Sequence, residues 1–151
     1  MKFLKTVFQN NIFSIINLYP PFLGAGVKIK KLNDNLDLHV SMNLNIFNRN
    51  YVGVHFGGSL YSMCDPFYML IVMKKLGRNY IVWDKEASIK FKSPGKGKVH
   101  ATFVITDDDI KDIKENTLDG KPYQPTFYVN VLGPDNKVVA EVSKTLWIKK
   151  K

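Results

Sequence analysis

Hydrophobic and polar residues alternate along six stretches of this chain, and a period of two is typical of β-strands with one buried face. The first two stretches are joined by the turn residues Asp34 and Asn35, so we expect a tight antiparallel hairpin. Turns that contain glycine and proline separate later stretches, at residues 93–97 and 133–136. The predicted strands cover residues 27–30, 36–44, 80–92, 99–105, 123–132 and 138–148.

One segment departs from this pattern. Residues 61–73 are almost continuously apolar and long enough to favour a helix over a strand. Gly58 or Ser59 is suited to begin this helix and Gly77 to end it, while Pro66 is expected to kink it. A helix that is apolar nearly all round is expected to be buried nearly all round. In a chain of 151 residues, that burial requires a sheet wrapped around the helix.

The first 22 residues are expected to form a separate amphipathic helix, because apolar residues recur there every three or four positions. The pair Pro20-Pro21 is expected to stop this helix. We expect the helix to pack on the body of the protein, and a peripheral membrane helix is the alternative. The recurring apolar residues are Leu4, Phe8, Ile12, Ile15 and Tyr19.

The order of elements predicts an α+β fold with a largely antiparallel sheet: a helix, two strands, a long buried helix and four strands. The three aspartates at 107–109, with Ile110 and Ile113, predict a short exposed helical turn between two strands. Neither repeats nor linkers divide the sequence. We therefore expect one domain over residues 1–151, with the amino-terminal helix in residues 1–22 and the core in 23–151.

Composition narrows the class of protein. One cysteine excludes a disulfide framework and fits a reducing compartment, so we expect a cytoplasmic protein. No segment approaches the ~20 apolar residues of a membrane span, and no stable membrane insertion is expected. The 22 Lys and Arg against 13 Asp and Glu give a net charge of +9, which predicts attraction to polyanions: nucleic acid, anionic lipid or a phosphate-rich cofactor.

Residues 50–66 carry the candidate chemistry. Gly57 and Gly58 bring bare backbone N–H groups to the start of a helix, where unpaired donors and the positive end of the helix dipole suit a developing oxyanion. Asp65 places a carboxylate within an apolar helix, where a charge costs several kcal/mol unless it is paired. The alternative is structural: Asp65 satisfies a backbone group freed by Pro66, or binds a buried lysine.

The arrangement Asn-x-x-Gly-x-x-x-Gly-Gly at residues 50–58, with Asp65 seven positions after Gly58, resembles the hotdog-fold thioesterases. The segments 56–60 and 89–95 are most similar to a thioesterase-like branch of that superfamily, and the resemblance extends from about residue 27 to the end. It implies a long helix wrapped by an antiparallel sheet, which agrees with the predicted element order.

The resemblance also implies roles for individual residues. Asp65 is the general base, or else the nucleophile, that acts on a thioester. The N–H of Gly57, with that of Gly58, is the oxyanion donor, and Asn50 positions the attacking water or the thioester carbonyl.

One position departs from the family pattern. Many of these enzymes carry a histidine immediately before the glycine pair, where this chain has Phe56. His55 lies one residue earlier, so it is either a displaced catalytic histidine or a loop histidine hydrogen-bonded to backbone.

Spacing adds a prediction about assembly. Gly58 and Asp65 are seven residues apart, or about 10.5 Å along one continuous helix. A base and an oxyanion donor so far apart cannot act on one carbonyl. We therefore expect Asp65 of one chain to face the glycine turn of another, in a homodimer or a dimer of dimers.

The implied substrate is an acyl-CoA thioester, with coenzyme A as part of the substrate and no separate cofactor. Basic residues near the site would attract its phosphates, although most surface lysines are simply solvated. The acyl chain is expected to be lined by Phe67, Tyr68 and Leu70. The basic residues assigned to coenzyme A are Lys90, Lys92, Lys96 and Arg49.

Two other functions remain open from the sequence. A non-catalytic hotdog module that binds acyl groups or acts as a scaffold is supported by Phe56 at the usual histidine position. A nucleic-acid stacking face of Tyr80, Trp83 and Phe91 is the weaker hypothesis, because no RNA-binding motif surrounds them and such aromatics more often lie in a core. We expect no nucleic-acid partner.

The remaining reactive residues are interpreted as structural. Cys64 is expected to be a small buried thiol. The three histidines lack the spacing of a metal site, so no metal is implied.

Overall fold

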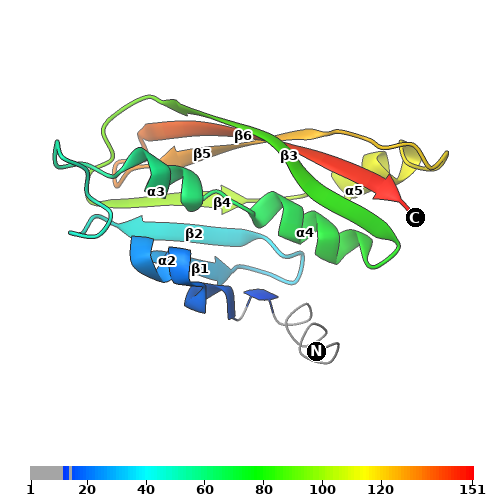
Figure 1. Ribbon diagram of the computed structural model, residues 1–151, viewed down its shortest axis with the longest axis horizontal. Helices are drawn as coiled ribbons and strands as arrows, with labels where there is room; N and C mark the ends of the chain where they lie inside the picture. The colour runs from blue at the N-terminus through cyan, green and yellow to red at the C-terminus, as the bar shows by residue number, and fades with distance from the viewer. Residues whose placement is uncertain (1–11, 14) are drawn as a thin grey trace.

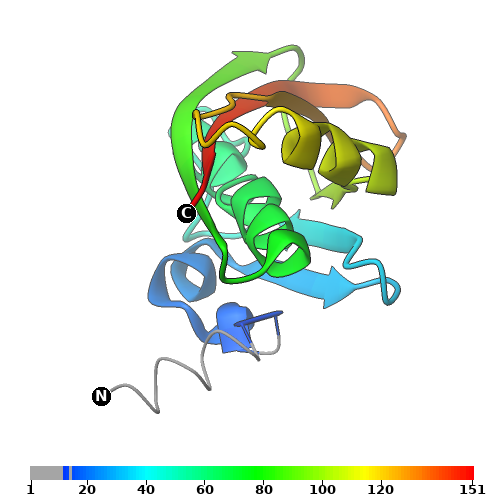
Figure 2. The ribbon, with the colours of Figure 1, turned by 90° about the vertical axis from the view of Figure 1, so that its right-hand side faces the viewer.

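The computed structural model describes residues 12–13 and 15–151, and in these residues one antiparallel sheet curls around a helical segment (Figures 1 and 2). The six strands lie in the order β1-β2-β4-β5-β6-β3, so β1 and β3 are the two edges. Their bounds are β1 Val27–Lys31, β2 Leu38–Asn43, β3 Tyr80–Phe91, β4 Lys98–Phe103, β5 Thr126–Leu132 and β6 Val138–Lys150.

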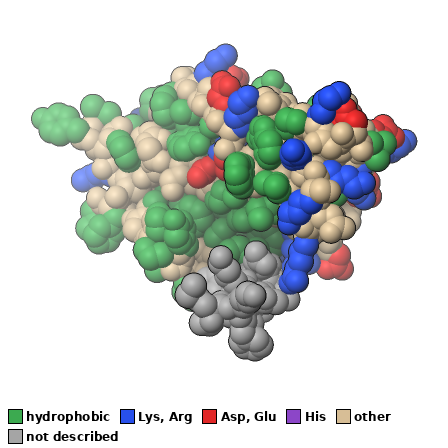
Figure 3. Space-filling model, turned by 45° about the vertical axis from the view of Figure 1, so that its right-hand side comes forward, with side chains coloured by type: hydrophobic (Ala, Val, Ile, Leu, Met, Phe, Trp, Pro, Cys, Tyr) green, Lys and Arg blue, Asp and Glu red, His purple; other side chains and the backbone are tan. Residues whose placement is uncertain are grey.

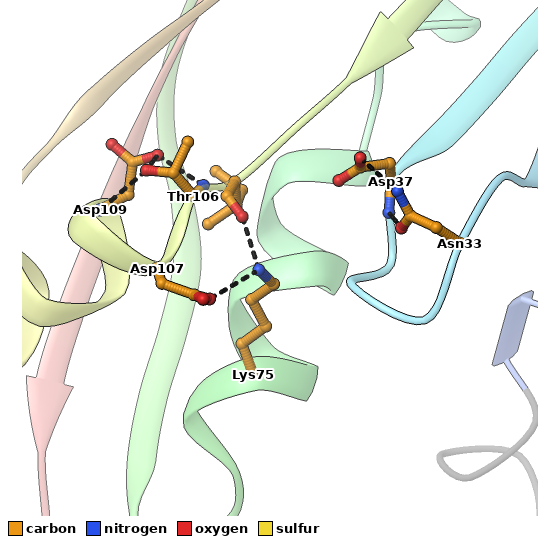
Figure 4. Close-up of polar contacts among 7 residues, drawn as sticks. Asn33, Asp37, Lys75, Thr106, Asp107 and Asp109 are labelled. Atoms are coloured by element: carbon orange, nitrogen blue, oxygen red, sulfur yellow. Dashed lines mark hydrogen bonds and ion pairs between the residues drawn. The ribbon is translucent and has the colours of Figure 1, made fainter.

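The predicted strands are therefore present, and β1 and β2 pair as the expected hairpin, with Val27 opposite Met42. Figure 4 shows Asn33 and Asp37 fastening the turn of this hairpin: the Asn33 Nδ2 donates to Asp37 at 2.6 Å. The last predicted strand extends two residues further than expected, to Lys150.

The central helix is interrupted. Helix α3, Gly57–Ser62, and helix α4, Phe67–Leu76, are separated by the turn 63–66, in which the Asp65–Pro66 peptide bond is cis. Pro66 thus divides the predicted helix instead of merely kinking it. The separation of 10.5 Å between Gly58 and Asp65 assumed one uninterrupted helix, and that assumption was wrong.

Burial of the helical segment agrees with its apolar composition. Phe67 and Ile71 are fully buried, and the Phe67 ring lies 5.1 Å from that of Phe103 on β4. Figure 2 shows α4 enclosed between the β1–β2 side and the β3–β6 side of the curled sheet. Burial of apolar surface contributes about 25 cal/mol per Å², so this helix–sheet interface stabilises the domain.

The amino-terminal region differs from its prediction. Most of the predicted helix over residues 1–22 lies outside the described residues. A 3-10 helix, η1, covers Ile16–Leu18, and Pro20-Pro21 then begins the helix α2, Pro20–Ala25, since proline fits the first turn of a helix. The proline pair therefore starts a helix as well as following one.

These elements cover the outer side of β1. The Asn17 side chain accepts from the Ile29 N–H at 2.8 Å and donates to the Ile29 carbonyl at 3.0 Å, which satisfies backbone groups on the free edge of β1. Phe22, 2% exposed, stacks on Phe67 with 5.8 Å between ring centroids.

Helix α5 covers Asp107–Glu115 and confirms the short helix predicted there. Its first turn has a capping box: Asp109 N–H donates to the Thr106 hydroxyl at 3.1 Å, and Thr106 N–H donates to the Asp109 carboxylate at 2.8 Å. Lys75 of α4 reaches the same turn (Figure 4), donating to the Ile105 carbonyl at 2.6 Å and pairing with Asp107 at 3.6 Å.

Candidate active site

Asp65 lies in the turn between α3 and α4, not within a helix as its sequence context predicted. Its carboxylate pairs with Lys144 of β6 in the same chain, which is the structural alternative that the sequence left open. The Asp65 side chain is nevertheless 41% exposed, so the ion pair leaves the carboxylate open to solvent.

Four side chains from four elements form what we call the Lys144 cluster: Asp65 of the α3–α4 turn, Lys144 of β6, Asp84 of β3 and Tyr61 of α3. The Lys144 Nζ hydrogen-bonds Asp65 and donates to the Tyr61 hydroxyl at 3.2 Å. It also lies 3.2 Å from Asp84 Oδ1, an ion pair without hydrogen-bond alignment. With both carboxylates ionised, the cluster carries one uncompensated negative charge.

The ionisation of the cluster follows from burial and pairing. Burial alone lowers the pKa of the Lys144 ammonium, but the hydrogen bond and charge of Asp65, with the charge of Asp84, outweigh it and raise that pKa to about 12. Burial raises the pKa of Asp84, and the positive charge of Lys144 offsets only part of that rise. Burial likewise raises the pKa of the neighbouring Cys64 thiol to about 12, so Cys64 is the neutral buried thiol expected from the sequence.

The sequence analysis missed Lys144 and Asp84. The signal for Lys144 was present: strand β6 alternates, its inward positions on either side are Val142 and Leu146, and Lys144 occupies the inward position between them at 1% exposure. A lysine at an inward, buried position of a strand requires a carboxylate partner. The signal for Asp84 was weaker, because the register of β3 shifts between Asp84 and Glu86 and interrupts the regular alternation of the strand.

The glycine pair forms the first turn of α3, as predicted, with Phe56 as the residue preceding the helix. Aromatic rings lie directly against both glycines. A Cβ on Gly57 would stand 2.8 Å from the Phe91 ring, and a Cβ on Gly58 would stand 2.3 Å from the Phe56 ring. The close approach of these two rings accounts for glycine at both positions.

Asn50 and His55 belong to the loop that precedes α3. The Asn50 Oδ1 accepts from the Val54 N–H at 3.1 Å and closes a tight turn. His55 is 2% exposed, its Nε2 lies 2.9 Å from the Gly97 carbonyl oxygen, and burial lowers its pKa. His55 is thus a loop histidine bonded to backbone, the alternative stated for it above.

The basic residues assigned to coenzyme A lie on the surface of the protein. Lys90, Lys92, Lys96 and Arg49 are all exposed, and Lys92 pairs with Glu141 at 3.5 Å. Lys96 lines a surface pocket of about 360 Å³ between the β3–β4 loop and the β5–β6 turn. Figure 3 shows lysines and arginines spread along one side of the molecule beside exposed hydrophobic side chains.

Burial bears on the aromatic residues singled out from the sequence. Trp83 is 64% exposed and stacks on Trp147 at 5.7 Å, so the interpretation of this aromatic as a core residue was wrong. Phe67 and Tyr68 are buried, at 0% and 4% exposure, and Leu70 is half-buried; that these three residues line an acyl chain stays a prediction. Among the described residues, no group of three or more His, Cys, Asp or Glu is placed to hold a metal ion, and no helix is long and apolar enough to cross a bilayer.

Solved structures with the same architecture are numerous and distant in sequence. A Pseudomonas aeruginosa protein described as of unknown function and a probable thioesterase has a TM-score of 0.79 and 14% identity, covering 92% of this chain and 93% of that chain. A Chlorobaculum tepidum protein of unknown function has a TM-score of 0.75 and 14% identity, covering 95% and 94%. A Haemophilus influenzae thioesterase has a TM-score of 0.66 and 13% identity, covering 94% and 90%.

These likenesses and the sheet wrapped around α3 and α4 define the chain as a hotdog-fold protein, as the resemblance implied. The model of a family described as a domain of unknown function, DUF4442, matches residues 9–148, and the chain belongs to that family. A comparison with curated protein sequences found no match.

Proposed function

We propose that this protein is an acyl-CoA thioesterase in which Asp65 is the general base. The observation that carries the proposal is the state of the Asp65 carboxylate, which is fixed by an ion pair yet 41% exposed at the break between two buried helices. A base must be both positioned and accessible to water, and this carboxylate meets both requirements. The thioesterases that share the hotdog fold support the same chemistry.

In the proposed reaction, Asp65 removes a proton from a water molecule whose oxygen attacks the thioester carbonyl. A C–O bond forms, the C–S bond breaks, and the proton passes from Asp65 to the departing coenzyme A thiolate. The N–H groups of Gly57 and Gly58 stabilise the oxyanion, and Asn50 positions the carbonyl through the amide nitrogen, since its Oδ1 is engaged with Val54. His55 supports this loop through its contact with the Gly97 carbonyl and does not contact the substrate.

The proposed active unit is a homodimer or a dimer of dimers. Support comes from β3, an edge strand of twelve residues that has no strand paired on its outer side among the described residues. Long exposed edges are templates for pairing with another chain. Trp83 and Phe91 on this strand are 64% and 58% exposed, which adds apolar area for a partner to cover. The reducing compartment inferred from the single cysteine makes the cytoplasm the proposed location.

A non-catalytic acyl-binding module is the second candidate. It is favoured by Phe56, which occupies the usual histidine position and lies over Gly58. The two candidates differ in whether thiol is released.

A panel of acyl-CoA esters with thiol detection separates the two candidates. We expect release of coenzyme A, and a kcat lower by at least about 100-fold for Asp65→Asn and Asp65→Ala, the lower end of the range for general-base catalysis. Asp108→Asn, an exposed aspartate of α5, is the matched control. Full turnover by folded Asp65→Ala rejects Asp65 as the base, and binding by calorimetry without thiol release identifies the module.

A further inference from the structure

Lys144 is a buried cation on β6, the strand next to the edge strand β3. Its strand partners are Ala87 on β3 and Phe127 on β5, and its own side chain is 1% exposed. Strand β6 reads Val142, Lys144, Leu146 at successive inward positions, so an apolar side chain is what the packing alone would favour. Replacement of buried ion pairs by apolar residues is often neutral or stabilising, which means that stability by itself does not explain a lysine here.

The ammonium group is held in one place by all its neighbours. Its Nζ hydrogen-bonds the Asp65 carboxylate and the Tyr61 hydroxyl, forms an ion pair with Asp84 at 3.2 Å, and lies 5.5 Å from the centroid of the Tyr61 ring. Of the two carboxylates, that of Asp65 is the more exposed, at 41% against 26% for Asp84. Lys144 therefore links the rigid sheet to the one carboxylate of the cluster that substrate can reach most readily.

We propose that Lys144 is a positioning residue that holds the Asp65 carboxylate in its reactive orientation, with Asp84 as the second counterion of Lys144. This inference rests on the proposed thioesterase function. Asp65 sits in a turn without a helix to fix its side chain, so the charge-assisted bond to Lys144 supplies the orientation that secondary structure does not. A misplacement of about 1 Å in a catalytic group costs roughly 100-fold in rate.

The other ionisable groups around Asp65 support this assignment. Tyr61 on α3 accepts a hydrogen bond from Lys144, and the Cys64 thiol is neutral because burial raises its pKa to about 12. Asp84 on β3 has a raised pKa because of burial, and Lys144 on β6 supplies the positive charge that faces both carboxylates.

The test compares two variants that differ only in the ammonium group. Asp84→Asn keeps the bond between Lys144 and Asp65, and the double variant Lys144→Met/Asp84→Asn removes the cation without leaving a buried Asp84 carboxylate unpaired. We expect kcat of the double variant to fall roughly 100-fold below that of Asp84→Asn, with KM changed less than about threefold. Lys111→Met on the exposed face of α5 is the control for loss of a lysine charge.

A substrate-free measurement accompanies the kinetics. The pKa of Lys144, followed by NMR of its ammonium group, is expected near 12 in the wild-type protein and lower in Asp65→Asn. If kcat of the folded double variant equals that of Asp84→Asn, or if Asp65→Asn leaves the Lys144 titration unchanged, the positioning role is wrong while the thioesterase function stands. If wild-type protein hydrolyses no thioester, the function fails and the inference fails with it.

Discussion

Replacing Lys144 by methionine, a side chain of similar length without charge, removes the ammonium that faces Asp65 and Asp84. Loss of one partner of a buried ion pair typically costs about 3–5 kcal/mol, because the remaining charge is left unpaired. Water already reaches Asp65, at 41% exposure, so most of the cost falls on Asp84, at 26%. We therefore expect the free energy of unfolding to fall by about 3 kcal/mol, the lower end of that range.

Asp84→Asn isolates the source of this loss. Since burial raises the pKa of Asp84, the ionised form is disfavoured in the folded state, and we expect Asp84→Asn to remain within about 1 kcal/mol of wild type. The double variant is expected to be more stable than Lys144→Met alone by about 1 kcal/mol or more. After subtraction of the effect of Asp84→Asn in the wild type, that difference gives the coupling energy between the two residues.

Urea unfolding followed by tryptophan fluorescence suits this comparison, because Trp83 of β3 stacks on Trp147 of β6. These two strands also carry Asp84 and Lys144. For a chain of 151 residues, a loss of about 3 kcal/mol lowers Tm by roughly 6–12 °C. The reasoning is refuted if Lys144→Met is as stable as the surface variant Lys111→Met, or if adding Asp84→Asn restores none of the lost stability.

Two further results follow from the structure. Folding raises the pKa of Lys144 from 10.5 to about 12. The stability that its ion pairs contribute is therefore complete below pH 10.5 and is lost as the pH rises through about 12. Asp65→Asn should reduce this loss of stability at alkaline pH, measured by urea unfolding between pH 9 and 12. Asn48 is 1% exposed, and its side chain donates to the carbonyls of Ala25 and Asn43, both at 2.8 Å. Asn48→Ala should therefore lower the free energy of unfolding by about 2–4 kcal/mol, measured by thermal unfolding. A loss below about 0.5 kcal/mol would contradict a structural role for Asn48.

The strands and their pairing in the β1–β2 hairpin were predictable because alternation is a local property of the sequence. The course of α5 was predictable for the same reason, from the aspartates of its first turn. The start of α3 was predicted only approximately: Gly58 or Ser59 was expected to begin the helix, which begins at Gly57. The break between α3 and α4 was predicted only in part. Pro66 signals a distortion, but whether a helix bends or is divided into two depends on the packing of both halves against the sheet.

The residues of the candidate site likewise fall into those that the local sequence indicated and those that it did not. Asp65, Gly57 and Asn50 were selected from one local segment, and their roles remain proposals. Lys144 lies 79 residues from Asp65 in the chain, and no local pattern joins them. Trp83 was misjudged for a related reason, because a strand pattern does not tell which strand lies at the edge of the sheet.

The sequence by itself determined the period of each strand, the apolar character of the central segment and the presence of an acidic residue beside Pro66. These are properties of neighbouring residues, fixed by backbone geometry and by the cost of exposing apolar side chains. Only the tertiary structure decided that β6 lies beneath the α3–α4 turn and brings Lys144 to Asp65. The interaction between two charges depends on the distance and the solvent between them, and both are set by the packing of the whole sheet around its helices.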